Sequence, residues 1–172
     1  MFGFLNFLFN DQSSEWKECV KVPLSLNLYN KSVNNAAIGD AYEKLQTFGR
    51  PNNRRPFKTN QFNYFLLGMD VRGADGKINS FHFTVRRNEE LFDEGVNEEH
   101  YIPCELSVIN KNGGHLLINP HTSPADIERF LGVPTEKDED VDFLSLIYES
   151  GEIALDFTFG EKHLLYDVYF GV

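Results

Sequence analysis

Polar side chains, of which a histidine and an aspartate could do acid–base chemistry, occupy every second position of several apolar segments, where they would share one face of a β-sheet and could contact a partner. They are Asp70, Arg72, His82 and Thr84 in the first half of the chain and Asp156, Thr158, Asp167 and Tyr169 in the second half. As a general base, His82 would need an oriented partner. Asp70 is such a partner only if the two strands pair in register. We therefore interpret His82 first as an exposed sheet histidine.

Metal-binding patterns are incomplete. Four acidic residues fall at positions 1, 3, 5 and 12 of a calcium-loop template: Asp138, Asp140, Asp142 and Glu149. Position 6 is Phe143, where the sharp turn of such a loop needs glycine, so we interpret the segment as a solvated acidic loop. His115 and His121 lack a third ligand at a zinc-type spacing. Phosphate loops, nucleophile elbows and Cys-x-x-Cys pairs are absent, so we predict no catalytic residue, metal, cofactor or enzymatic activity.

An internal repeat supplies the elements that position these residues. Residues 22–31 align without gaps on residues 102–111, and both segments alternate apolar and polar residues as a half-buried strand does. Gly49-x-Pro51 and Gly132-x-Pro134 then end a short helix in each half, with Asp40 and Ser123 as expected N-caps. We expect both glycines to adopt a left-handed backbone, so that alanine at either position costs about 1 kcal/mol.

Three further strands close each repeat. They are centred on residues 62–64, 67–71 and 81–85 in the first half and on 146–148, 153–157 and 166–170 in the second. In the last strand, aligning Phe83 with Val168 keeps both apolar faces inward, whereas a slip of one residue would turn one face outward. That alignment makes the loop at Asp75-Gly76 one residue longer than its counterpart at Glu161-Lys162.

The predicted fold class is α+β. Two tandem strand–helix–three-strand repeats form a continuous antiparallel sheet, with short helices packed on one face. An N-terminal apolar segment (1–21) packs on the fold or at a dimer contact, repeat 1 covers 22–87, an acidic connector covers 88–101, and repeat 2 covers 102–172. A repeat of about 75 residues without disulfides has only a marginal core, so we expect one compact unit.

A helix that ends in Leu-Gly-x-Pro and leads into antiparallel strands resembles the modules of β-lactamase-inhibitor-protein-like folds. Residues 127–134 fit that pattern, and residues 45–51 are a looser copy. The resemblance, which extends to bacterial proteins built from the same repeat, implies two modules in tandem with their helices behind a concave antiparallel sheet. We expect neither the disulfides nor the signal peptide of the secreted inhibitors, and no inhibitory loop motif matches.

Charge is distributed unevenly along the chain. Lys and Arg number 16 against 26 Asp and Glu, a formal net charge of −10, which argues against non-specific nucleic-acid binding. The loop after the first Gly-x-Pro is basic and includes Arg54 and Arg55, whereas the loop after the second is acidic and includes Asp138 and Asp140. These loops are either solvated separately, or complementary across a homodimer, or a polarised surface for a partner. No apolar run is long enough to span a bilayer, and we expect an unprocessed, cytoplasmic protein.

These features predict a non-enzymatic protein-binding module that acts through an open sheet face. Its most concrete form is a bacterial inhibitor or immunity-type protein with a basic partner, toward which the acidic charge would steer association. The expected contacts are the eight sheet-face residues together with Arg54, Arg55, Asp138 and Asp140. One alternative is a small-ligand-binding protein or enzyme that uses the concave sheet face, and another is a structural homo-oligomer held by the N-terminal aromatic residues. A broad, shallow face favours the first hypothesis, and a deep enclosed pocket favours the ligand-binding one.

Overall fold

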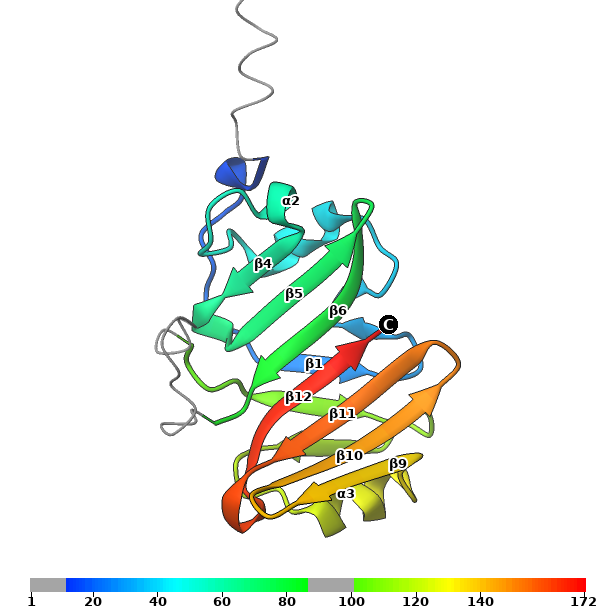
Figure 1. Ribbon diagram of the computed structural model, residues 1–172. Helices are drawn as coiled ribbons and strands as arrows, with labels where there is room; N and C mark the ends of the chain where they lie inside the picture. The colour runs from blue at the N-terminus through cyan, green and yellow to red at the C-terminus, as the bar shows by residue number, and fades with distance from the viewer. Residues whose placement is uncertain (1–11, 87–100) are drawn as a thin grey trace, which may run out of the picture.

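The computed structural model describes residues 12–86 and 101–172 as two β-sheets with short helices (Figure 1). The strands are β1 (Leu24–Asn27), β2 (Ser32–Val33), β3 (Ala36–Ala37), β4 (Gln61–Tyr64), β5 (Met69–Ala74), β6 (Lys77–Thr84), β7 (Leu106–Ile109), β8 (His115–Ile118), β9 (Glu136–Asp140), β10 (Phe143–Ser150), β11 (Ile153–Phe159) and β12 (Leu165–Gly171). The α-helices are α2 (Pro56–Thr59) and α3 (Pro124–Leu131), and the 3₁₀ helices are η1 (Gln12–Glu15), η2 (Tyr42–Phe48), η3 (Phe65–Leu67) and η5 (Glu161–His163).

The larger sheet joins the two repeats. Its seven strands lie in the order β4-β5-β6-β12-β11-β10-β9, and every neighbouring pair is antiparallel (Figure 1). Strand β6 of the first repeat pairs with β12 of the second, so that Thr84 lies opposite Asp167 and Phe81 lies opposite Phe170. The α+β class and an antiparallel sheet that runs through both repeats are therefore confirmed.

The pairing of β6 with β12 confirms that the last strand of each repeat turns its apolar residues inward, as the sequence predicted. Phe83 lies directly opposite Val168, and both side chains are fully buried. The alternate residues His82 and Tyr169 lie opposite each other and are half-buried. A slip of one residue would have turned the apolar side chains of one strand toward solvent.

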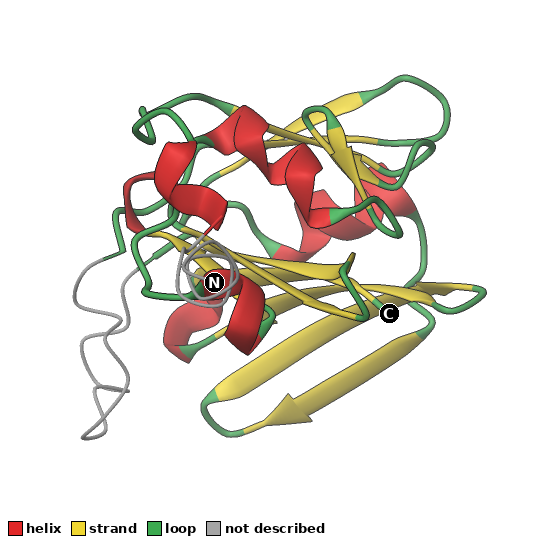
Figure 2. Cartoon of the chain, turned by 90° about the horizontal axis from the view of Figure 1, so that it is seen from above, coloured by secondary structure: helices red, strands yellow, loops and turns green. Residues whose placement is uncertain are grey.

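The first strand of each repeat does not join the larger sheet, which corrects the predicted architecture. Strands β1 and β7 lie in the middle of a five-stranded sheet, β3-β2-β1-β7-β8, and run parallel to each other with Leu24 opposite Leu106. Figure 2 shows this smaller sheet as a second layer over one side of the long strands. The larger sheet is apolar on that side, so only a second layer can shield it from water, and the buried leucines of β1 and β7 help to provide that layer.

The helix of the second repeat is capped as predicted, whereas that of the first is not. The Ser123 hydroxyl accepts a hydrogen bond from Asp126 N (3.2 Å), and Asp126 Oδ2 accepts one from Ser123 N (3.1 Å), which forms a capping box for α3. In the first repeat η2 begins after Ala41, which makes no side-chain cap bond. Asp40 accepts a hydrogen bond from Ala37 N (2.9 Å) instead and so stabilises the preceding turn.

Gly49 and Gly132 end these helices with nearly the same backbone. Their dihedral angles are φ 83°, ψ −163° and φ 95°, ψ −162°. The predicted positive φ is confirmed, but the ψ values place both residues in an extended region that is essentially restricted to glycine. A β-carbon on Gly132 would meet open space, whereas one on Gly49 would lie 2.8 Å from backbone atoms of Cys19 and Glu18. The sequence predicted that both positions would tolerate alanine equally. The structure indicates instead that Gly49 tolerates alanine less well than Gly132 does.

The acidic segment is an edge strand rather than the predicted loop. Strand β9 pairs with β10 across a turn at Val141-Asp142, and all five of its residues are exposed. Charged side chains on an edge strand disfavour its pairing with another chain. The predicted difference between the other hairpin loops is reversed: Asp75-Gly76 is a two-residue turn, whereas its counterpart, residues 160–164, includes η5.

The aromatic run within residues 1–11 and the connector 88–100 lie outside the described residues, so their packing stays a prediction. In the described part of the N-terminal segment, Trp16 stacks on Phe62 (6.3 Å between ring centroids) and meets Phe57 edge-on (5.7 Å). Within residues 12–86 and 101–172, no helix has both the length and the apolar character of a membrane span.

Candidate functional site

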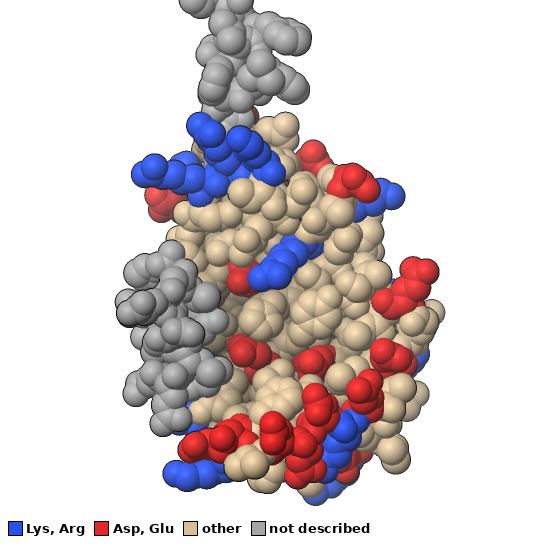
Figure 3. Space-filling view, viewed as in Figure 1, with Lys and Arg blue, Asp and Glu red and all other residues tan. Residues whose placement is uncertain are grey.

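The eight sheet-face residues all lie on the side of the larger sheet that faces away from the smaller one. Cross-strand pairing places them in three neighbouring rows: Asp70, His82, Tyr169 and Asp156; Thr84, Asp167 and Thr158; and Arg72. Figure 3 looks onto this face. Because the rows cross the β6–β12 pair, the face is continuous over both repeats. We call it the open face.

His82 lies near the middle of the open face, between two carboxylates. Asp70 is its cross-strand partner, as the in-register prediction requires, and Asp167 Oδ1 lies 3.6 Å from His82 Nε2. Burial, together with the nearby Arg72 guanidinium, lowers the pKa of His82 below 6.5. The imidazole is therefore neutral at pH 7, and its contact with Asp167 is not an ion pair at that pH.

Two further residues of this region were not among the predicted site residues. Ser145 Oγ donates a hydrogen bond to Asp156 Oδ1, and the Tyr101 hydroxyl donates one to Asp70 Oδ1. Burial raises the pKa of Asp156, with the Ser145 hydrogen bond opposing the rise and the Asp138 carboxylate adding to it. Ser145 alternates with apolar residues along β10 as the predicted face residues do, so its position was detectable. Tyr101 lies outside any strand and carries no such signal.

Arg54 and Arg55 lie at one end of the larger sheet, in a loop that two asparagines hold against β4. Asn53 Nδ2 donates to Gln61 O (2.7 Å), and Asn53 Oδ1 accepts from Asn63 N (2.9 Å). Asn52 Oδ1 accepts from Phe65 N (2.9 Å). These bonds satisfy backbone groups along the outer edge of β4, so they fix both the sheet edge and the loop that carries the arginines.

A depression of about 700 Å³ opens beside the two arginines. Its lining includes Arg50 and Glu18, which form a backbone bridge between the N-terminal segment and this loop. Cys19 also lines it, and burial raises the pKa of the Cys19 thiol. Three arginines of the first repeat, Arg50, Arg54 and Arg55, thus line one hollow at the end of the molecule that carries α2.

Asp138 and Asp140 lie at the opposite end, on the edge strand β9. They alternate along the strand, with Asp138 opposite Ser145 and Asp140 opposite Phe143. In Figure 3 a cluster of Lys and Arg lies at the α2 end and Asp and Glu predominate at the β9 end, with some charges of the opposite sign at both ends. Among the described residues, no group of His, Cys, Asp and Glu side chains is arranged to hold a metal ion.

Comparison with known proteins adds one structural similarity. No family model and no curated protein matches the sequence. Among solved structures, the chain is similar to the crystal structure of a DUF4309 family protein, YjgB, from Bacillus subtilis subsp. subtilis str. 168. The two are 15% identical over 81% of this chain and 83% of that one, with a TM-score of 0.47. A similarity at that level carries no inference about function, so the functional assignment rests on the site itself.

Proposed function

We propose that this protein is a non-enzymatic protein-binding module whose partner docks on the open face. The continuity of that face carries the proposal, because β5, β6, β12 and β11 present one polar and aromatic surface across the boundary between the repeats. The depressions of about 640 and 700 Å³ on this molecule are lined by other residues, and none of the eight open-face residues lines either one. A broad face suits a protein surface better than an enclosed substrate.

The charge distribution indicates the chemistry of the partner. The formal net charge of −10 and the acidic β9 end favour a protein that presents cations to that end. Complementary charge mainly raises the rate of association and excludes wrong partners. An inhibitor or immunity-type protein of a basic toxin is the most specific version of this proposal, in line with the resemblance to inhibitor-type repeat modules.

A second candidate, a structural homodimer, is favoured by the placement of the charges. The end of the molecule that carries α2 is basic, and the opposite end, which carries β9, is acidic (Figure 3). Two copies packed face to face, with the two-fold axis perpendicular to the line between these ends, would therefore bring the basic end of one protomer against the acidic end of the other. A two-fold interface needs this kind of self-complementary surface.

Affinity capture with matched surface variants tests the proposal. Wild type, an open-face variant (Thr158→Ala with Tyr169→Ala) and a control (Thr47→Ala with Tyr29→Ala) are immobilised and exposed to extract from the native host. The control removes the same residue types from exposed positions outside the open face. We expect wild type and control to retain one common partner that the open-face variant loses, and raised salt to weaken capture.

Retention of the same partner by all three proteins contradicts binding through the open face. Sedimentation velocity of the purified protein distinguishes a structural homodimer from a monomer that binds a foreign partner. A dimer that the open-face variant abolishes and the control leaves intact favours the structural homodimer over a foreign partner.

A further inference from the structure

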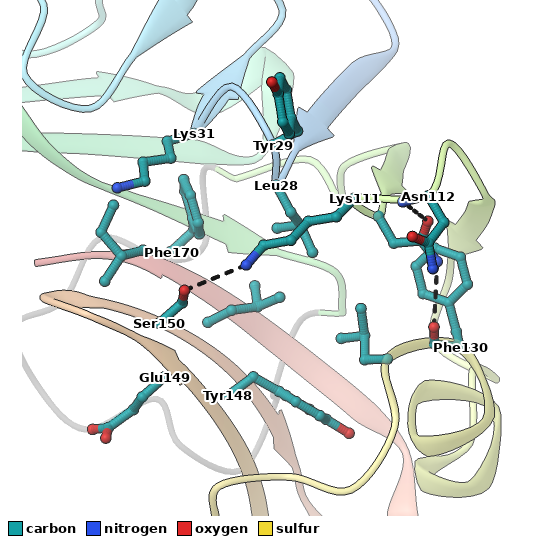
Figure 4. Close-up of a pocket in the computed structure, with 14 residues that line it drawn as sticks. Leu28, Tyr29, Lys31, Lys111, Asn112, Phe130, Tyr148, Glu149, Ser150 and Phe170 are labelled. Atoms are coloured by element: carbon teal, nitrogen blue, oxygen red, sulfur yellow. Dashed lines mark hydrogen bonds between the residues drawn. The ribbon is translucent and has the colours of Figure 1, made fainter.

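A groove of about 640 Å³ lies where the two sheets and the end of α3 meet, on the side of the larger sheet opposite the open face. It is bounded by the turn at residues 28–31, the turn at residues 110–112, the last residues of α3 and the β10–β11 hairpin (Figure 4). Both repeats and both sheets therefore contribute walls. The volume falls within the range of small-molecule binding sites.

Much of the wall of the groove is apolar. Leu28, Phe130, Leu131, Tyr148 and Ile153 line it as half-buried side chains, and Leu155 and Phe170 lie deeper, with only 4% and 2% of their surface exposed. Leu155 and Phe170 alternate along β11 and β12 with Asp156 and Tyr169 of the open face. The groove and the open face therefore use opposite sides of the same strands.

Two lysines at equivalent positions of the repeat flank this apolar wall. Lys31 and Lys111 follow Asn30 and Asn110 in the aligned segments, and both line the groove. Figure 4 shows their side chains extending over the space between the two turns and the β10–β11 hairpin. Lys111 Nζ lies 3.4 Å from Ser150 Oγ, and within the described ranges neither ammonium group is within 4.0 Å of a carboxylate oxygen.

The turns that carry the lysines are held by asparagine side chains. Asn27 Oδ1 accepts from Tyr29 N (2.9 Å) and Asn30 N (3.0 Å) in the first turn. Asn110 Oδ1 accepts from Asn112 N (3.0 Å) and Gly114 N (2.9 Å) in the second. Asn110 Nδ2 also donates to Phe130 O (3.4 Å), which ties that turn to the end of α3. The two cations are therefore mounted on preformed turns, so that less ordering is needed when a ligand binds.

We propose that this groove binds a small amphipathic carboxylate, with its apolar body on the hydrophobic wall and its carboxylate between Lys31 and Lys111. Each lysine offers a compact positive charge with three donors, and the apolar wall beside these charges favours a ligand that joins one anionic group to a hydrophobic body. Glu149 also lines the groove, and its negative charge disfavours a ligand with several anionic groups.

Titration calorimetry with decanoate tests the site on the full chain. Wild type is compared with Lys31→Gln/Lys111→Gln and with the control Lys44→Gln/Lys58→Gln, which changes the net charge equally at exposed positions outside the groove. We expect saturable binding to wild type and control, and roughly tenfold weaker binding to the groove variant. Decylammonium, which has the same chain length and the opposite charge, is expected to bind wild type more weakly than decanoate does.

Three results would overturn the inference: no saturable decanoate binding to wild type, equal affinity in the groove variant and wild type, or decylammonium binding as tight as decanoate. Far-ultraviolet circular dichroism of each variant shows that it is folded before it is compared. The readout is independent of the capture experiment, because none of these substitutions touches the open face.

Discussion

At the scale of single residues, His82 shows how burial and charge set the properties of the open face. Burial and Arg72 lower its pKa below 6.5, whereas a neighbouring carboxylate such as Asp167 acts in the opposite direction. We expect an NMR titration of the His82 ring to give a midpoint below 6.5. Arg72→Gln should raise that midpoint, and Asp167→Asn should lower it further. A wild-type midpoint at or above 6.5 contradicts this description of the site.

The same shift has a consequence for stability. Below pH 6.5 the unfolded chain takes up a proton at His82 before the folded chain does, so the unfolded state binds more protons in the interval down to the lowered pKa. The free energy of unfolding should fall as the pH drops through that interval. His82→Gln should show a shallower pH dependence there than wild type, as measured by urea unfolding at several pH values.

Gly49 and Gly132 form a matched pair, because their backbone angles are nearly identical and their surroundings are not. Gly132→Ala should cost on the order of 1–3 kcal/mol from backbone strain alone. Gly49→Ala should cost more, because its β-carbon would also lie 2.8 Å from backbone atoms of Cys19 and Glu18, which cannot move as a flexible side chain can. Urea unfolding of the two variants measures the difference, and an equal or smaller loss for Gly49→Ala would rule out this ranking.

At the scale of elements, alternation in the sequence predicted strands and their faces well but not their partners. Phe81, Phe83 and Val168 were placed correctly because a half-buried strand must alternate. The same alternation at Leu24 and Leu26 predicted a strand but could not show that it belongs to a second sheet, since pairing is decided by contacts distant in sequence. The residues of β9 carry no apolar side chain, so its strand character follows from backbone pairing with β10.

The candidate site, too, was predictable from the sequence only in part. The pairs Asp70 and Arg72, His82 and Thr84, and Asp156 and Thr158 each share a face because they are two residues apart in a strand, and this was predictable. The contact of Tyr101 with Asp70, and the groove between the turns of Lys31 and Lys111, depend on how distant segments pack together. The sequence showed that the two Asn-Lys turns are equivalent in the repeat, but it could not show that both turns line the same groove.

The acidic residues of β9 should prevent this edge strand from pairing with a strand of another molecule. In Asp138→Thr/Asp140→Thr the edge loses charge and gains residues that favour strands, so we expect self-association that increases with protein concentration. Sedimentation velocity measures it. The control Glu43→Thr/Glu128→Thr removes the same charge from helical positions and should stay as monodisperse as wild type. Equal behaviour of the two variants would show that the edge charges have no such role.

At the scale of the whole molecule, both sheets cross the boundary between the repeats. Strand β6 pairs with β12 in the larger sheet, and β1 pairs with β7 in the smaller one. Separating the repeats would leave strand edges unpaired in each half and would expose apolar side chains such as Phe83 and Leu106 that are fully buried. A segment of about 75 residues has only a marginal core of its own, so these shared contacts should decide stability.

Equilibrium unfolding of two fragments, residues 1–98 and residues 99–172, tests most directly whether the repeats form one folding unit with one open face. Full-length protein should unfold in a single cooperative transition, and neither fragment alone should show a native-like circular dichroism spectrum or a cooperative urea transition. Two fragments that each unfold cooperatively, with stabilities that account for that of the full chain, would contradict a shared sheet and with it a binding face built by both repeats.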